Sequence, residues 1–128
     1  MTREADPLPG AMQLLEQLAP STADKVKTKL ENFCPGASEI ILGFAFTDVI
    51  ARQGIDLRTR EMLTIAMLSA MGTAPDQLDF HMRAAMSAGV TREEIVEIAL
   101  QVAVYAGVPA CINAINSATK AFDYFENS

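Results

Sequence analysis

Apolar residues recur along most of the chain at the three- and four-residue spacing of an α-helix, and the interruptions fall at prolines and glycines. A sustained alternation of apolar and polar residues, which would indicate a β-strand, is nowhere found. The pattern therefore predicts an all-α fold, a single helical bundle of about six to seven helices. The expected helices cover residues 10–19, 22–33, 37–54, 58–71, 73–89, 91–107 and 109–125.

Residues with strong positional preferences mark the expected helix ends. Ser21 is placed to cap the second helix, and Thr91 followed by Glu94 three residues later matches a capping box. Gly72 and Gly89 follow the fourth and fifth helices, where a glycine commonly ends a helix. The fourth and fifth helices are thus expected to form a hairpin that turns at Gly72.

The helix over 58–71 has apolar residues in nearly every direction, yet it carries Glu61 near its start. A helix that is apolar all round belongs in a protein interior or an oligomer interface. A carboxylate in such a place needs a partner. The same Thr-Arg-Glu triplet recurs at residues 91–93, where ordinary helix-start chemistry explains it.

Length and charge narrow the class of protein. A chain of 128 residues is expected to form one domain with its own core, spanning 1–128. Its net charge of −6 and lack of clustered Lys and Arg argue against binding to nucleic acid or to an anionic membrane. A small molecule or another protein subunit is the expected partner.

Cysteine usage and apolar content indicate a soluble, cytoplasmic protein. Cys34 and Cys111 lie far apart, with no CxxC pair and no cluster at metal-ligand spacing. The first fifteen residues contain acidic residues and prolines before any apolar run, so they do not match a secretory signal. The longest apolar region is interrupted by Gln101, Gly107 and Pro109, and it is too short to span a bilayer.

His81 is the single histidine of the chain, and Leu78, Ala84 and Ala85 share its helical face. A hairpin turning at Gly72 would bring His81 and Glu61 towards one pocket, where they could form a general acid–base pair. Purely structural readings stay open: His81 as a core or interface histidine, and Glu61 paired with Arg58 one turn earlier.

Other polar residues have simpler interpretations. Tyr105, late in an apolar helix, is typical of a packing residue with its hydroxyl at an edge, although it is kept as a candidate for contact with a ligand. Cys111 is expected to behave as a small buried hydrophobe. A solvated helix face accounts for Asn113, Asn116, Lys120 and Asp123.

The stretches IDLRTREMLTIAMLSAMG and HMRAAMSAGVTREEIVEIALQVAVYAGVPACINAI resemble the carboxymuconolactone decarboxylase family, which also includes alkylhydroperoxidase D. The resemblance runs from about Asp48 to Phe122 and favours the stand-alone decarboxylase type. It implies an all-helical domain whose core covers about 36–125, preceded by N-terminal helices over 10–33. It also implies a homo-oligomer, a trimer or hexamer of small subunits.

Residue by residue, Glu61 matches the glutamate of the family's Thr-Arg-Glu motif and His81 the histidine of its His-x-Arg-Ala-Ala motif. The resemblance implies that these two residues perform acid–base catalysis. Arg60, Arg58 and Tyr105 are the candidates for substrate binding, while Arg83 is expected to serve a neighbouring subunit.

The reaction implied by the resemblance is decarboxylation of 4-carboxymuconolactone to the enol-lactone of 3-oxoadipate, a step in the breakdown of protocatechuate. No metal or organic cofactor is expected, because the electrons released with carbon dioxide can delocalise into the lactone carbonyl.

Three alternatives stay open. The first is a related lyase or isomerase that acts on another lactone or a keto acid. The second is a redox protein that uses Cys34 or Cys111, but the alkylhydroperoxidase branch carries a CxxC pair shortly before its histidine, and GTAPDQLDFH has no cysteine there. The third is a non-catalytic oligomeric module that binds a metabolite.

Overall fold

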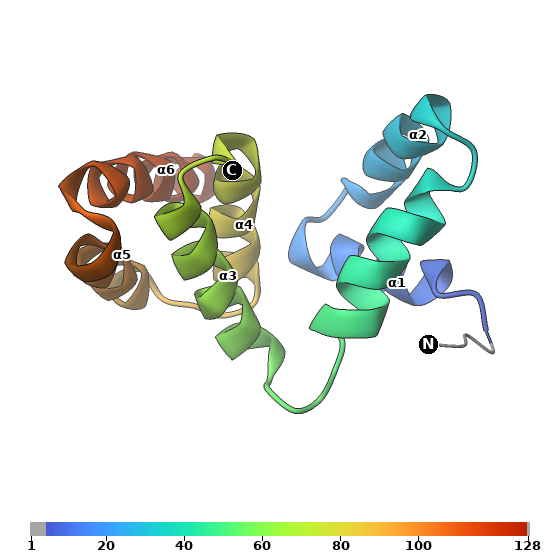
Figure 1. Ribbon diagram of the computed structural model, residues 1–128, viewed down its shortest axis with the longest axis horizontal. Coiled ribbons are helices and arrows are strands. Elements are labelled where there is room, and N and C mark those ends of the chain that lie inside the picture. Colours follow the sequence, from blue (N-terminus) through green and yellow to red (C-terminus); the bar gives the residue numbers. More distant parts are fainter. Residues whose placement is uncertain (1–4, 128) are drawn as a thin grey trace. The chain divides into compact units, whose positions relative to one another are not determined.

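The computed structural model describes residues 5–127, and these residues form seven helices and no strand. In chain order the helices are α1 (Leu8–Leu18), α2 (Ala23–Phe33), η1 (Glu39–Ile50), α3 (Leu57–Met71), α4 (Pro75–Ser87), α5 (Arg92–Ala106) and α6 (Val108–Glu126) (Figure 1). The predicted all-α fold is confirmed. The helices fall into two compact units, one reaching to Leu57 and the other beginning at Arg58.

The first unit is built around α1, which packs against both η1 and α2 (Figure 1). Leu15 and Leu18 of α1 are buried, as are Leu42 and Phe46 of η1. The hydroxyl of Thr47 donates a hydrogen bond to the carbonyl oxygen of Pro7 at 2.6 Å, which fixes η1 beside the start of α1.

The third helix differs from its prediction in both length and type. It ends at Ile50 rather than near Gly54, and it is a π-helix, in which each N–H bonds to the carbonyl five residues earlier. The N–H of Ala51 continues this pattern to the carbonyl of Phe46 at 2.7 Å. Because the segment is apolar on every side, its sequence contains no α-helical stripe that would have distinguished the two windings.

Carboxylates hold the two turns of this unit. Ser21, predicted to cap α2, instead has a left-handed backbone (φ 67°), and its N–H donates to Glu16 Oε2 at 2.6 Å. Thr22 precedes α2 directly and makes no side-chain cap. In the next turn the Glu31 carboxylate accepts hydrogen bonds from the Ser38 hydroxyl and from the N–H groups of Ser38 and Gly36, which lowers the pKa of Glu31 to about 2.

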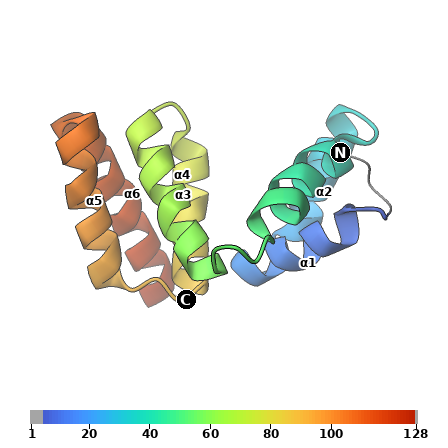
Figure 2. The same ribbon diagram turned by 60° about the horizontal axis from the view of Figure 1, so that its bottom comes forward.

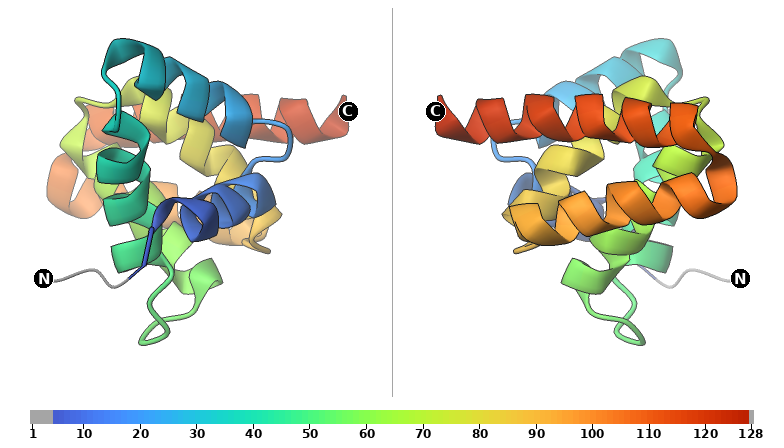
Figure 3. Two further views of the ribbon diagram at one scale, coloured as in Figure 1. Left: turned by 90° about the vertical axis from the view of Figure 1, so that its right-hand side faces the viewer. Right: turned by 90° about the vertical axis from the view of Figure 1, so that its left-hand side faces the viewer.

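The second unit comprises α3 to α6 (Figure 2). Residues from all four helices form one core, whose buried members are Ile65, Leu78, Met82, Ala85, Val90, Ile95, Ala99, Ala114, Ala118 and Ala121. The helices α5 and α6 lie side by side and meet at Gly107 (φ 94°), and α6 also contacts α4 (Figure 3). Five alanines in this core let the helices approach closely.

The helix ends of this unit lie within two residues of their predicted positions. Gly72 and Gly89, which follow α3 and α4, have φ values of 70° and 99°, a conformation that favours glycine. At the start of α5 the capping box is complete. The hydroxyl of Thr91 accepts from the N–H of Glu94 at 3.1 Å, and the carboxylate of Glu94 accepts from the N–H of Thr91 at 2.9 Å. Within residues 5–127, none of the helices combines the length with the apolar character that crossing a membrane requires.

Candidate active site

The buried face of α3 explains why this helix carries a glutamate. Glu61, Ile65 and Ser69 follow one another at four-residue spacing and are the buried residues of the helix. Leu63, Met67 and Met71 point the other way and are exposed. The all-round apolar character of the helix therefore has two sources, a face in the subunit core and a face on the surface.

Glu61 and His81 meet across the α3–α4 hairpin. His81 Nδ1 lies 3.0 Å from Glu61 Oε1, so the proximity predicted from the turn at Gly72 is confirmed, and it occurs within one chain. The Glu61 side chain is fully buried, whereas that of His81 keeps 16% of its surface exposed. The second carboxylate oxygen, Oε2, has no hydrogen-bond partner among the described residues.

The surroundings of His81 set what the imidazole can do. Leu78, Ala84 and Ala85 of its own helix are buried, and the ring of Phe80 meets the imidazole edge to face, with centroids 5.0 Å apart. Since a carboxylate accepts hydrogen bonds, the contact assigns a proton to Nδ1 and leaves Nε2 as the nitrogen available to a ligand. The pair therefore offers one directed nitrogen in a site with little solvent.

Arg58 has partners other than Glu61. Its Nε donates to the carbonyl oxygen of Gly89 at 3.2 Å, and its guanidinium forms an ion pair with Glu94 Oε2. The open reading in which Arg58 pairs with Glu61 is thus wrong. The Arg58 guanidinium, together with hydrogen bonds from Thr91, lowers the pKa of Glu94 to about 2.

The other predicted site residues are spread over the second unit. Arg60 is half-buried in the first turn of α3. Tyr105 is 89% exposed and lines an apolar groove of about 410 Å³ between α3 and α5, to which neither Glu61 nor His81 contributes. The guanidinium of Arg83 lies over the ring of Tyr124 at 5.4 Å.

The cysteines occupy different environments. Cys34 is exposed, Cys111 is buried, and neither is in a disulfide. Cys111 is only 7% exposed, which confirms its prediction as a small buried residue.

A polar cluster on α4 and α6 had no counterpart in the sequence predictions. Asp79 accepts hydrogen bonds from the Ser117 hydroxyl at 2.6 Å and from Lys120 Nζ at 3.2 Å. Burial acts to raise the pKa of Asp79, but the bonds from Ser117 and Lys120 outweigh it and the pKa is lowered. These residues line a polar cavity of about 360 Å³ together with Asn113 and Asn116. The solvated face predicted on α6 is therefore partly a cavity wall.

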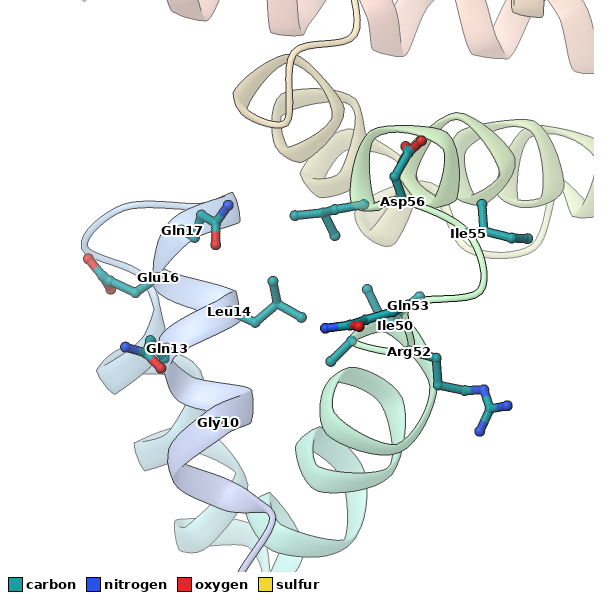
Figure 4. A pocket seen from close by; sticks show the side chains of 12 residues that line it. Gly10, Gln13, Leu14, Glu16, Gln17, Ile50, Arg52, Gln53, Ile55 and Asp56 are labelled. Atoms are coloured by element: carbon teal, nitrogen blue, oxygen red, sulfur yellow. The ribbon is translucent and has the colours of Figure 1, made fainter.

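A cavity of about 830 Å³ lies in the first unit, and neither Glu61 nor His81 lines it. Its walls come from α1 and from the segment that follows η1. Figure 4 shows Leu14 pointing from α1 towards Ile50, while the guanidinium of Arg52 points away. The lining of this cavity contains no histidine or cysteine, so Glu61 and His81 are the better candidates for catalysis.

Comparison with known proteins identifies the family of the chain. The sequence model described as the Carboxymuconolactone decarboxylase family matches residues 35–120, a segment that includes both Glu61 and His81. A 4-carboxymuconolactone decarboxylase of Acinetobacter baylyi is 35% identical over 107 residues, covering 84% of this chain and 79% of the relative.

Two further relatives are of similar closeness. A nitrosuccinic acid decarboxylase of Metarhizium robertsii is 35% identical over 96 residues, covering 73% of this chain and 66% of the relative. An uncharacterized 15.0 kDa protein of Paracoccus denitrificans is 32% identical over 94 residues, covering 73% of this chain and 70% of the relative. Both relatives with a named activity are decarboxylases. The chain belongs to the carboxymuconolactone decarboxylase family and is a carboxy-lyase.

Proposed function

We propose that the protein decarboxylates 4-carboxymuconolactone, or a similar lactone carboxylate, to 3-oxoadipate enol-lactone and carbon dioxide. The observation that carries the proposal is the contact between the buried Glu61 carboxylate and His81, in a chain 35% identical to a 4-carboxymuconolactone decarboxylase. In this proposal the reaction belongs to the breakdown of protocatechuate and takes place in the cytoplasm, without a metal or an organic cofactor.

The reaction makes two demands on the site. When the bond to the departing carboxylate breaks, its electron pair passes through the neighbouring double bond to the lactone carbonyl oxygen and forms a dienolate. A proton must then reach the carbon beside that carbonyl to give the enol-lactone. The site must therefore stabilise a developing negative charge and deliver one proton.

His81 is suited to both demands. With Nδ1 bound to Glu61, a protonated imidazole presents its Nε2–H to the substrate, donates a hydrogen bond to the developing oxyanion and then transfers the proton to carbon. Water returns a proton to His81 after product release. Glu61 holds the orientation of the ring and stabilises the imidazolium that the cycle requires.

The substrate also has a carboxylate that stays, and this group needs a cation. We propose that Arg60, in the first turn of the helix that carries Glu61, binds it. Arg58 is the second candidate, although it would have to exchange Glu94 for the substrate. Tyr105 would contribute only to a ligand that extends into the groove between α3 and α5.

A second candidate substrate is nitrosuccinate, favoured by the relative from Metarhizium robertsii. Nitrosuccinic acid also has two carboxylates, and one is attached to a carbon that bears a nitro group. That nitro group can accept the electrons released with carbon dioxide, as the lactone carbonyl does. The same residues would then serve both reactions, and the shape of the site would decide between the substrates.

The test is turnover of freshly generated 4-carboxymuconolactone, followed by ultraviolet absorbance, with nitrosuccinate assayed in parallel. We expect turnover of the lactone, and a fall of at least about 100-fold in His81→Ala and in Glu61→Gln. Glu97→Gln, which alters an exposed carboxylate on α5, is the matched control and should keep full activity.

Each outcome of this test decides something. Turnover of nitrosuccinate alone would select the second candidate, and turnover of neither substrate by a folded wild-type protein would reject both. Full activity in His81→Ala would remove His81 from the mechanism.

A further inference from the structure

The α3–α4 hairpin is closed covalently at one end only. The turn at Gly72 joins α3 to α4, whereas the first turn of α3, which holds Arg58, lies at the opposite, open end. Glu61 follows Arg58 by three residues, and within residues 5–127 its carboxylate makes one hydrogen bond, through Oε1 to His81. Because Oε2 has no partner among the described residues, the carboxylate's own bonds fix its position only in part. The position of Glu61 therefore depends on how the start of α3 is held.

Arg58 supplies contacts at that open end. Its Nε donates to the carbonyl oxygen of Gly89, two residues beyond the end of α4, and its guanidinium pairs with Glu94 in the first turn of α5. The stem of Arg58 also runs beside Gly89, where an added Cβ would meet its Cδ at 3.8 Å. One side chain of α3 thus binds the segment that follows the helix carrying His81.

A hydrogen bond within the capping box of α5 holds the Glu94 carboxylate in place for this ion pair. Its Oε1 accepts the N–H of Thr91 at 2.9 Å in the capping box, which leaves Oε2 to face the guanidinium. The Arg58 guanidinium, followed by the hydrogen bonds from Thr91, lowers the pKa of Glu94 to about 2. The acceptor is therefore a carboxylate that α5 orients and that is ionised at neutral pH.

We propose that Arg58 is a positioning residue that closes the open end of the hairpin onto Gly89 and Glu94, and thereby holds Glu61 against His81. This role differs from direct binding of the substrate carboxylate, because Arg58 acts through the spacing of α3 and α4. The expected effect of this positioning on turnover rests on the proposed function, whereas the positioning itself does not.

The first test reads the Glu61–His81 contact without any substrate. His81 is the single histidine of the chain, so its imidazole nitrogen and proton signals can be assigned in an NMR spectrum without ambiguity. We expect Arg58→Met and Glu94→Gln each to speed exchange of the Nδ1 proton with water about tenfold, and the double variant to do no more than either single variant. Glutamine keeps an oxygen for the Thr91 N–H, so Glu94→Gln removes the ion pair with Arg58 while the cap of α5 stays intact.

Arg92→Met is the matched control. Arg92 is 43% exposed, close to the 41% of Arg58, and it forms an ion pair with Glu126 elsewhere in the same unit. This variant should leave the His81 signals unchanged. Unchanged His81 signals in Arg58→Met, or independent effects of Arg58→Met and Glu94→Gln, would overturn the proposal. If Arg58→Met fails to fold, Glu94→Gln and Arg58→Lys carry the test.

Steady-state kinetics separate positioning from substrate binding. If Arg58 is a positioning residue, kcat should fall in both Arg58→Met and Glu94→Gln while KM changes little. Arg58→Lys should recover part of the loss. A rise of KM in Arg58→Met with no change in Glu94→Gln would instead make Arg58 a substrate ligand. The wild-type protein could turn over no lactone while Arg58→Met and Glu94→Gln still speed exchange of the His81 Nδ1 proton. In that case the proposed function would fail and the positioning role of Arg58 would stand.

Discussion

A buried glutamate with one bonded oxygen is an unfavourable feature for a small helical core. Glu61 is fully buried, and only Oε1 has a partner among the described residues. Burial of a carboxylate costs free energy unless both oxygens find partners, so residues of this kind are commonly kept for function rather than stability.

This imbalance predicts that one substitution separates stability from activity. Glu61→Met removes a buried charge but leaves the Nδ1–H of His81 without its acceptor, so we expect the free energy of unfolding to change by no more than about 1 kcal/mol. Turnover should be lost. Denaturant unfolding, combined with the activity assay, measures both effects.

Ile65, one turn further along the same buried face, provides the comparison. Ile65→Ala should lower the free energy of unfolding by about 2–4 kcal/mol, because it leaves a cavity. A comparable loss in Glu61→Met would show that the glutamate is structural.

At the scale of residues, the sequence predicted the pair but not its setting. Glu61 and His81 could be paired in advance because one short turn joins their helices, which limits how they can lie. Arg58 was placed beside Glu61 by helical spacing alone, whereas its partner Glu94 lies 36 residues away and required the packed structure. The Asp79–Ser117 contact spans 38 residues and was missed for the same reason.

At the scale of elements, the start of α5 combines two functions in one carboxylate. Glu94 completes the capping box and pairs with Arg58, so its ionised form is bound in the folded protein more strongly than in the unfolded chain. Its pKa falls from 4.5 to about 2 on folding. A depressed folded-state pKa stabilises the protein above the unfolded value and loses that effect as the pH falls towards the folded value.

The stabilising effect of Glu94 should therefore be full above about pH 5 and fade as the pH falls from 4.5 to about 2. We expect Glu94→Gln to be less stable than the wild type at neutral pH, and the difference to shrink across this interval. Urea unfolding at a series of pH values measures it. The exposed Glu97→Gln serves as the control and should follow the wild-type curve. A difference between Glu94→Gln and the wild type that stayed constant down to pH 2.5 would contradict this account.

Helix ends were predictable where the residues that form them lie close together in the sequence. Gly72, Gly89 and the Thr91–Glu94 box act within a few residues, and the structure has each of them as expected. Ser21 failed as a cap because Glu16, from the preceding helix, binds its N–H and that of Ala23. The π-helical form of η1 was not predicted, because an evenly apolar segment has no apolar stripe that would reveal its period.

At the scale of the whole molecule, the family match crosses the boundary between the two units. It begins at residue 35 and ends at residue 120, while the boundary lies at Leu57. The segment common to the family therefore contains η1, α3, α4, α5 and the greater part of α6. Among the described residues, α1 and α2 precede this segment.

We propose that the protein is a homo-oligomer, a trimer or a hexamer as the family resemblance implies, and the apolar surface of the second unit supports this proposal. Met67, Val104 and Val108 are 59%, 72% and 63% exposed, and the groove between α3 and α5 is lined almost entirely by apolar side chains. So much apolar surface is unusual for a monomer of 13.8 kDa and would be covered by other subunits.

Light scattering coupled to gel filtration should give a mass that is three or six times 13.8 kDa. Val104→Glu should reduce that mass, because a charge buried at a subunit contact is costly. The same charge placed at the exposed Ser87, beside no apolar groove, should leave the mass unchanged. A wild-type protein that ran as a monomer at micromolar concentration would show that this apolar surface has another purpose. The unusual composition of α3 would then require a different explanation on its outward face, while the inward face would still hold Glu61 against His81.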